Sequence, residues 1–381
     1  MSESDTFIQI IETARTPAAT DHWIADLARQ LAGSGESILD HSGLTADIPS
    51  TGGPSSLSTL LCPLFLAASG LVIPKLGVPG RPAGGLDVMA QIPGYRTNLD
   101  PTDVKAILAE CRYAHFDAKD RIAPMDRELF AFRQVTGAQA IVPLVIASLL
   151  AKKIAVGVER VGLDIRASEH GNFGSTAVEV EENARKFMRV ATLLGINATA
   201  FITDASRPYQ PYIGRGEALL GLHAFFEGQA SPWLSRHINQ CIFMTAQLSS
   251  DPIQMEPLAL RRQFDLHLTA QGANPASFDE LVHKIKAQRT LEIFADRDGY
   301  INFDLAIIRD ALVLCQRDFL VDTKFPDPAG VILLAEPDEF VRRGQPVMRV
   351  RGEVTNTVMA LRAAIVISSF PKRVNVDVLH A

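Results

Sequence analysis

Strand-like and helix-like segments alternate through the middle of the chain, and this alternation constrains the fold more than any other feature. The segment VERVGLDIRAS (158–168) is apolar and β-branched, TAVEVEENARKFMRVATLLG (176–195) has the composition of a helix that ends in glycine, and INATAFITDAS (196–206) is strand-like again. Strands separated by single helices usually pair in parallel through right-handed crossovers. The pattern therefore predicts an α/β domain built on a parallel sheet.

The two ends of the chain have different patterns. Residues 6–34 show helical spacing of apolar positions, with Thr20 and Asp21 as possible caps of a second helix. The last hundred residues contain short alternating runs broken by Pro, Gly and Asp, which predicts a small β-rich domain. We expect a small helical domain from 1–45 with 110–155, an α/β domain from 46–109 with 156–295, and a C-terminal α+β domain from 296–381.

Composition excludes several classes of function. The net charge is −6 and the pI is about 5.9, so no overall basic field attracts nucleic acid or an anionic membrane. The longest apolar stretches are shorter than the roughly 20 residues of a membrane span. The four cysteines are far apart, without metal-ligand spacing, and the N-terminus has no basic region typical of a secretory signal. We expect a cytoplasmic protein without a bound metal.

A stretch rich in Ser, Thr and Gly, STGGPSSLST (50–59), directly precedes the apolar run LLCPLFLAASG (60–70). The pair Gly52 and Gly53 allows the backbone to turn its N–H groups toward an oxyanion, and hydroxyls at Ser50, Ser58 and Thr59 can add donors at a helix N-terminus. Ser and Thr are also ordinary N-cap residues, so a capped surface turn is the alternative.

The order of further motifs resembles the pyrimidine nucleoside phosphorylases, the thymidine phosphorylase family, which shares its fold with anthranilate phosphoribosyltransferase. The segment FAFRQVTGAQAIVPLVIASLLAKK (130–153) resembles that family's second signature, an arginine followed by a serine and a lysine, here Arg133, Ser148 and Lys152. Later segments at 162–174, 200–222 and 327–352 are similar to the family's next elements. The resemblance covers about residues 45 to 355 and implies a small helical domain, a larger α/β domain and a β-rich C-terminal domain.

The resemblance also identifies departures on the phosphate side. The family's glycine loop carries a lysine and a histidine where this chain has Ile48 and Pro49, and two hydroxyl donors of a later segment appear as Gly77 and Gly85. Lys75 and Arg81 can restore the positive charge from that later segment, or they can be solvated loop residues. The phosphate site implied by the resemblance therefore consists of Ser50, Gly52, Gly53, Ser58, Thr59, Lys75 and Arg81.

The base side keeps the family's pattern. Donors aimed at a departing base stabilise its negative charge, and the resemblance assigns this catalytic and base-binding role to Arg133, Ser148 and Lys152. Ser148 and Lys152 share a helix face at i, i+4. Phe130 stands where a tyrosine is usual and can shape the base pocket without donating a hydrogen bond. The alternatives are an interdomain salt bridge for Arg133, helix packing for Ser148 and Phe130, and a surface charge for Lys152.

The implied function is a pentosyltransferase that cleaves a pyrimidine-type nucleoside with phosphate to give free base and pentose 1-phosphate. Its partners would be the nucleoside and phosphate, with no cofactor, no nucleic acid and no membrane, and the family resemblance implies a homodimer. Because phosphate ligands are missing, a different acceptor such as water is a second hypothesis. A non-catalytic relative that binds nucleosides or a protein partner is a third.

Overall fold

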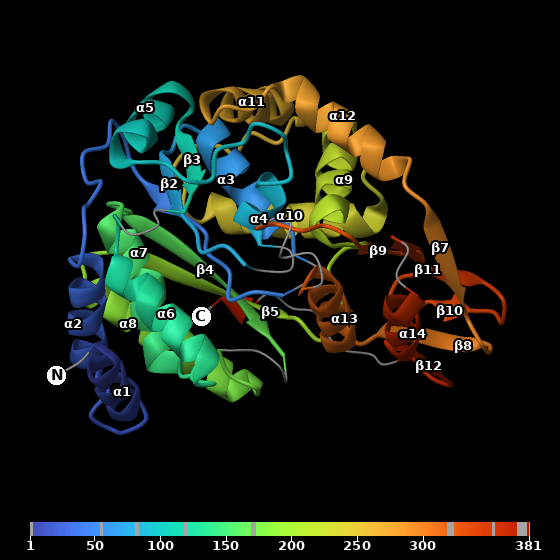
Figure 1. Cartoon of the computed structure of the whole chain (residues 1–381), viewed down its shortest axis with the longest axis horizontal. Coiled ribbons are helices and arrows are strands. Elements are labelled where there is room, and N and C mark those ends of the chain that lie inside the picture. Colours follow the sequence, from blue (N-terminus) through green and yellow to red (C-terminus); the bar gives the residue numbers. More distant parts are fainter. Residues whose placement is uncertain are drawn as a thin grey trace.

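The computed structural model describes residues 3–53, 56–80, 84–117, 121–168, 173–317, 324–352, 355–371 and 379–380. Figure 1 shows a sheet with helices on either side of it, the N-terminal helices on the left, and the C-terminal strands as a separate group on the right. The expected α/β class is therefore confirmed.

The central sheet is parallel, as the alternation predicted. β1 (Ala46–Asp47), β4 (Arg160–Ala167) and β5 (Asn197–Asp204) pair in that order, and the short β13 (Leu379–His380) adds an antiparallel strand to β5. β2 (Ile73–Leu76) and β3 (Tyr113–Phe116) also pair in parallel. A parallel bridge between Thr45 and Val72 joins the two groups, so the parallel strands follow the order β3, β2, β1, β4, β5.

Local sequence signals explain where many helices begin. The Thr20 side chain accepts a hydrogen bond from the Trp23 N–H and caps the second helix, as expected. Thr176 and Glu179 form a complete capping box at the start of the long helix between β4 and β5. The helices of this part are α1 (Glu3–Ala14), α2 (Asp21–Ala32), α3 (Ser58–Ala68), α4 (Gly85–Met89), α5 (Pro101–Cys111), α6 (Pro124–Val135), α7 (Val142–Ala155) and α8 (Ala177–Leu193).

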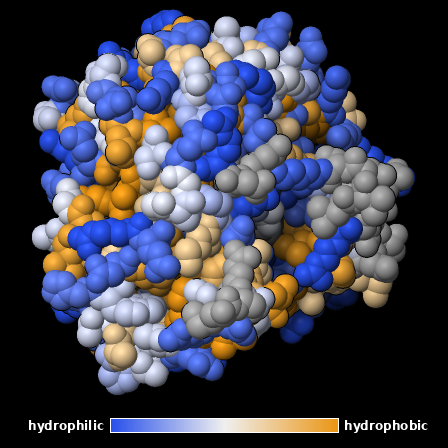
Figure 2. All heavy atoms as spheres, turned by 60° about the vertical axis from the view of Figure 1, so that its left-hand side comes forward, coloured by the Kyte–Doolittle hydropathy of each residue, from blue (hydrophilic) through white to orange (hydrophobic). Residues whose placement is uncertain are grey.

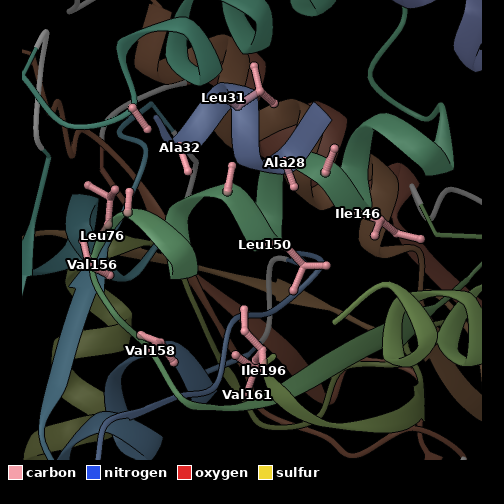
Figure 3. Close-up of a cluster of buried hydrophobic side chains, with 14 of the residues drawn as sticks. Ala28, Leu31, Ala32, Leu76, Ile146, Leu150, Val156, Val158, Val161 and Ile196 are labelled. Atoms are coloured by element: carbon pink, nitrogen blue, oxygen red, sulfur yellow. The ribbon is translucent and has the colours of Figure 1, made fainter. Parts of the chain in front are cut away.

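Two apolar cores enclose the sheet. In the first, helices α2 and α7 pack on each other, and Figure 3 shows Leu31 of α2 and Leu150 of α7 above Val161 of β4. The second core joins α3 to α9 (Arg215–Phe226), α10 (Pro232–Ala246), α11 (Pro257–Ala270) and α12 (Pro275–Lys286). Burial of apolar surface on both faces holds the strand ends of this sheet in fixed positions.

A third core belongs to the C-terminal part. Its strands are β6 (Tyr212–Ile213), β7 (Thr290–Phe294), β8 (Gly299–Phe303), β9 (Gly330–Leu333), β10 (Phe340–Val341), β11 (Pro346–Arg351) and β12 (Ile365–Ser368), and its helices are α13 (Leu305–Arg317) and α14 (Thr355–Ala363). They form two small sheets, β6-β9-β11-β7 and β10-β8-β12. The predicted β-rich character is present, with two helices added.

The predicted domain boundaries stay predictions, but two observations bear on them. The range 110–155 assigned to the helical domain includes β3, which belongs to the sheet. β7 lies before residue 295, yet it pairs with β11 of the C-terminal part.

The surface is mixed in polarity on the face that can be followed in Figure 2. On the face shown in Figure 2, apolar side chains form several separate areas between polar ones. None of the helices in the described ranges combines the length and the apolar character that a bilayer span requires. The homodimer remains a prediction.

Candidate functional site

The strand order changes direction between β1 and β4, and the glycine-rich segment begins where β1 ends. In open parallel sheets, ligands bind at such a switch point, outside the carboxyl ends of the strands. Ser50 continues the parallel pairing with a bridge to Asp164 of β4. The geometry therefore brings residues 48–53 and 56–58 together with the end of β4 at this position.

The glycine loop is tied to β4 on one side and open on the other. The Thr51 N–H donates to the Asp164 carbonyl at 3.0 Å, and the Arg166 N–H donates to Thr51 Oγ1 at 2.9 Å. Gly52 and Gly53 are exposed, with φ of 112° and 129°, values that strongly favour glycine. The loop conformation thus depends on its two glycines.

The start of α3 is already hydrogen-bonded within the protein. The Leu57 N–H donates to His237 Nε2 at 2.9 Å, and the Ser58 N–H donates to Ser56 Oγ at 3.1 Å. Ser58 is completely buried, and its hydroxyl donates to Asp164 Oδ2 at 2.6 Å. The predicted phosphate ligand Ser58 therefore contacts Asp164 in this state, whereas Ser50 and Thr59 are partly exposed.

Arg166 supplies a cation at this loop that the sequence analysis did not identify. Its Nη2 donates to Ser56 Oγ at 2.6 Å and to Asp164 Oδ2, and its guanidinium carbon lies 4.2 Å from the centre of the Tyr209 ring. Burial disfavours its charge, but the Asp164 carboxylate outweighs this effect and raises the pKa of Arg166. Arg166 and Asp164 therefore form a buried, charge-balanced pair.

A second buried cluster lies directly before the loop. Lys75 Nζ of β2 lies 2.6 Å from Asp47 Oδ1, and Lys153 Nζ of α7 contacts Asp47 Oδ2. Burial raises the pKa of Asp47, but Lys153 and Lys75 overcome this effect and lower the pKa below its usual range. Burial, together with Lys75, lowers the pKa of Lys153. With both lysines charged, two ammonium groups share one carboxylate, which leaves an excess of positive charge.

Of the other positions predicted on the phosphate side, Lys75 and Ile48 are buried. Lys75 is 5% exposed and is not the solvated loop residue of the alternative prediction, while Arg81 lies outside the described residues. Ile48 is completely buried, and its Cγ1 would lie 3.2 Å from a Cβ added to Gly162 of β4. The side chain of a lysine at position 48 would therefore leave the backbone inside the apolar core.

The base-side residues separate into two groups. Lys152 Nζ contacts Asp126 Oδ2 of α6, and it donates to Ser148 Oγ at 2.8 Å and to the Ser148 carbonyl at 3.0 Å. The Lys152 side chain is 12% exposed, so the surface-charge alternative does not describe it. This group brings Ser148 and Lys152 together, as their spacing predicted.

Arg133 forms the second group. Its Nε, Nη1 and Nη2 donate to the backbone carbonyls of Ala138, Leu144 and Gln139 at 3.2, 3.2 and 2.7 Å. Arg133 is buried, and these three hydrogen bonds hold the connection between α6 and α7. Phe130 lies on the same helix and is half-buried. Their base-binding roles stay predictions.

The sequence of the chain is similar to those of known nucleoside phosphorylases. Pyrimidine-nucleoside phosphorylase from Staphylococcus epidermidis RP62A is 26% identical over 350 residues, which cover 87% of this chain and 80% of that protein. Thymidine phosphorylase from Sinorhizobium medicae is 30% identical over 271 residues, which cover 67% of this chain and 61% of that protein. The chain is thus similar to pyrimidine-nucleoside and thymidine phosphorylases over most of its length, at identities typical of distant relatives.

The fold of the chain is similar to that of a solved phosphoribosyltransferase. Anthranilate phosphoribosyltransferase from Thermus thermophilus superimposes with a TM-score of 0.50 at 15% identity, over 74% of this chain and 94% of that chain. No protein-family model matches the chain.

Sequence reasoning missed several residues of this candidate site. Asp126 precedes Arg133 by two helical turns, so helical spacing alone could have identified it. The other missed residues lie on three strands, with Asp47 on β1, His115 on β3, and Asp164 and Arg166 on β4, and only the strand order brings them together.

Proposed function

We propose that this chain transfers the pentose of a pyrimidine-type nucleoside to phosphate and releases free base and pentose 1-phosphate. The finer assignments of a cytoplasmic homodimer and of a reaction without cofactor or metal belong to the same proposal. The observation that carries it is the buried cluster of Lys75, Lys153 and Asp47 beside the glycine loop.

The charge of this cluster supports an anionic ligand. A buried cation without a full counter-charge is costly, because its hydration is lost. Lys75 Nζ also donates to the Ile48 carbonyl at 3.2 Å, so the cluster borders the segment that leads into the glycine loop, and an oxyanion bound there would supply the missing negative charge. Phosphate in this position would be held by the loop backbone, Ser50, Thr59 and Lys75.

The base side supports departure of an anionic base. The bond between the base nitrogen and C1′ breaks, its electron pair stays on the base, and a phosphate oxygen forms the new bond to C1′. Lys152 and Ser148 are the proposed donors to the base oxygens and Arg133 the third, with Phe130 shaping the pocket. Lys152 is held by Asp126 and Ser148, so its ammonium is positioned before the base arrives.

A second candidate is cleavage with water or another anion as acceptor. Its support is that Ile48 is buried in the core and that the Ser58 hydroxyl is bonded to Asp164, which reduces the set of phosphate donors. A relative that binds nucleosides without catalysis is the third candidate.

Release of free base from uridine and thymidine, measured with and without phosphate, separates the three. We expect release only with phosphate, with pentose 1-phosphate as the second product. Release that does not require phosphate would favour water as acceptor, and absence of release would favour the non-catalytic relative.

Matched variants connect the activity to the site. Lys75→Met should raise the phosphate concentration needed for half-maximal rate about tenfold or more, since a lost charged hydrogen bond is worth about 1.5–3 kcal/mol. Lys105→Met on α5, where the lysine is exposed, should leave that value unchanged.

A further inference from the structure

We propose that the Nε2–H of His115 is an oxyanion donor of the phosphate site, in the space left by the absent side chains of Gly77 and Gly85. This inference rests on the proposed function and names a further binding residue for it. It is argued from the position of the ring, the crowding at the two glycines and the hydrogen bonds that orient the ring.

His115 lies beside Lys75. The two are register partners on the parallel strands β3 and β2, so their side chains point to the same face of the sheet. His115 is 3% exposed and Lys75 is 5% exposed. The imidazole therefore lies next to the cationic cluster in a region with little water.

The ring fills the volume beside both glycines. A Cβ added to Gly77 would lie 3.2 Å from His115 Nε2, and one added to Gly85 would lie 2.9 Å from His115 Cε1. The Gly85 position would also be 3.1 Å from Thr59 Cβ. The Nε2 edge of the ring thus faces residues 77 and 85 and lies near Thr59, a predicted phosphate ligand.

The contact with Tyr113 assigns the hydrogen of the neutral His115 ring to one of its two nitrogens. Tyr113 Oη lies 3.2 Å from His115 Nδ1, and this nitrogen is the acceptor within reach of the buried hydroxyl among the described residues. Burial raises the pKa of Tyr113 well above its usual value, so the hydroxyl stays protonated, and we assign it as the hydrogen-bond donor to Nδ1. Burial and nearby Lys75 lower the pKa of His115 well below 6.5. The neutral ring then carries its hydrogen on Nε2.

Other contacts fix this orientation. The His115 N–H donates to Gln271 Oε1 at 3.1 Å, and Gln271 Nε2 donates to the His115 carbonyl. The Tyr113 ring stacks on His267, with centroids 3.9 Å apart. Within the described residues, no protein acceptor is bonded to His115 Nε2. A fixed donor on a buried residue, without an acceptor among the described residues, is suited to an oxyanion.

The test is calorimetric binding of inorganic phosphate to the full chain. His115→Phe keeps a ring in the same volume but removes the donor, and should weaken phosphate binding about tenfold or more. His115→Gln places an amide N–H near the Nε2 position and should recover part of the affinity. His283→Phe on the exposed side of α12 is the matched control and should bind phosphate like the wild type.

The outcomes separate this inference from the proposed function. If the wild type and His115→Phe bind phosphate equally, the role of His115 is refuted while the phosphate site stands. If the wild type does not bind phosphate, the proposed function fails and this inference fails with it.

If His115→Phe does not fold, ¹⁵N NMR of the wild-type imidazoles decides. We expect a protonated Nε2 whose resonance shifts when phosphate is added. An unprotonated Nε2, or no shift at saturating phosphate, would overturn the proposal.

Discussion

Two adjacent lysines on α7 lie in different charge environments. Lys152 contacts Asp126 and forms a balanced pair at the base side, whereas Lys153 shares Asp47 with Lys75 at the glycine loop. Both regions are largely buried, but only the Asp47 cluster contains more positive than negative charge. With both lysines charged, the proposed phosphate side thus has an excess of positive charge, whereas the proposed base side has a balanced pair.

Removal of the shared carboxylate should have the largest effect. Asp47→Asn leaves two buried ammonium groups without their counter-charge, and we expect the free energy of unfolding to fall by about 3–5 kcal/mol. Urea denaturation measures this loss. Asp103→Asn breaks an exposed pair with Arg96 and should cost less than about 1 kcal/mol. Equal losses in the two variants would mean that the Asp47 cluster is not a buried charge network.

A lysine at position 48 should not repair the phosphate site. The side chain of Ile48 is completely buried, so Ile48→Lys places an ammonium group in the core and should lower the free energy of unfolding by roughly 3 kcal/mol. Ile48→Val should cost only about 1 kcal/mol. A stable Ile48→Lys protein that binds phosphate more tightly would show that this side chain can reach the anion.

Replacing a lysine by methionine should lower mainly stability in one region and mainly phosphate affinity in the other. Lys152→Met leaves Asp126 buried without its partner, and we expect a loss of about 2–3 kcal/mol of unfolding free energy. Lys75→Met leaves Asp47 paired with Lys153, so stability should change by less than about 1 kcal/mol while phosphate affinity falls. Denaturation and calorimetry on both variants test this contrast, and a large stability loss in Lys75→Met would contradict the charge excess.

Low pH should destabilise the protein through His237, which lies beside the glycine loop. Burial, and then Arg166, lower the pKa of His237 to about 3, so the folded state holds this ring neutral. An unfolded chain protonates it near pH 6.5, so stability is complete above that value and is lost progressively as the pH falls toward 3. From pH 7 to 5, the wild type should lose about 2 kcal/mol more than His237→Gln. Parallel pH dependences in the two proteins would exclude His237 as the cause.

Much of the fold was predictable because its signals are local. The β-branched runs at β4 and β5, the Thr20 cap and the glycine that ends each predicted helix all act within a few residues. The spacing of Ser148 and Lys152 likewise placed both on one helix face. The glycine loop was also recognisable, because positive φ angles at Gly52 and Gly53 require little beyond the residue type.

The sequence by itself therefore determined the order of elements, the α/β class and the position of the loop. The tertiary structure decided which charges meet. Asp47 reaches Lys75 across 28 residues and Lys153 across 106, and His115 faces Gly77 and Gly85 only because β3 pairs with β2. The packing of these segments is set by burial of distant apolar faces, and it removes water from the charges that it brings together. The pKa values and the excess positive charge follow from that packing, and no local pattern encodes them.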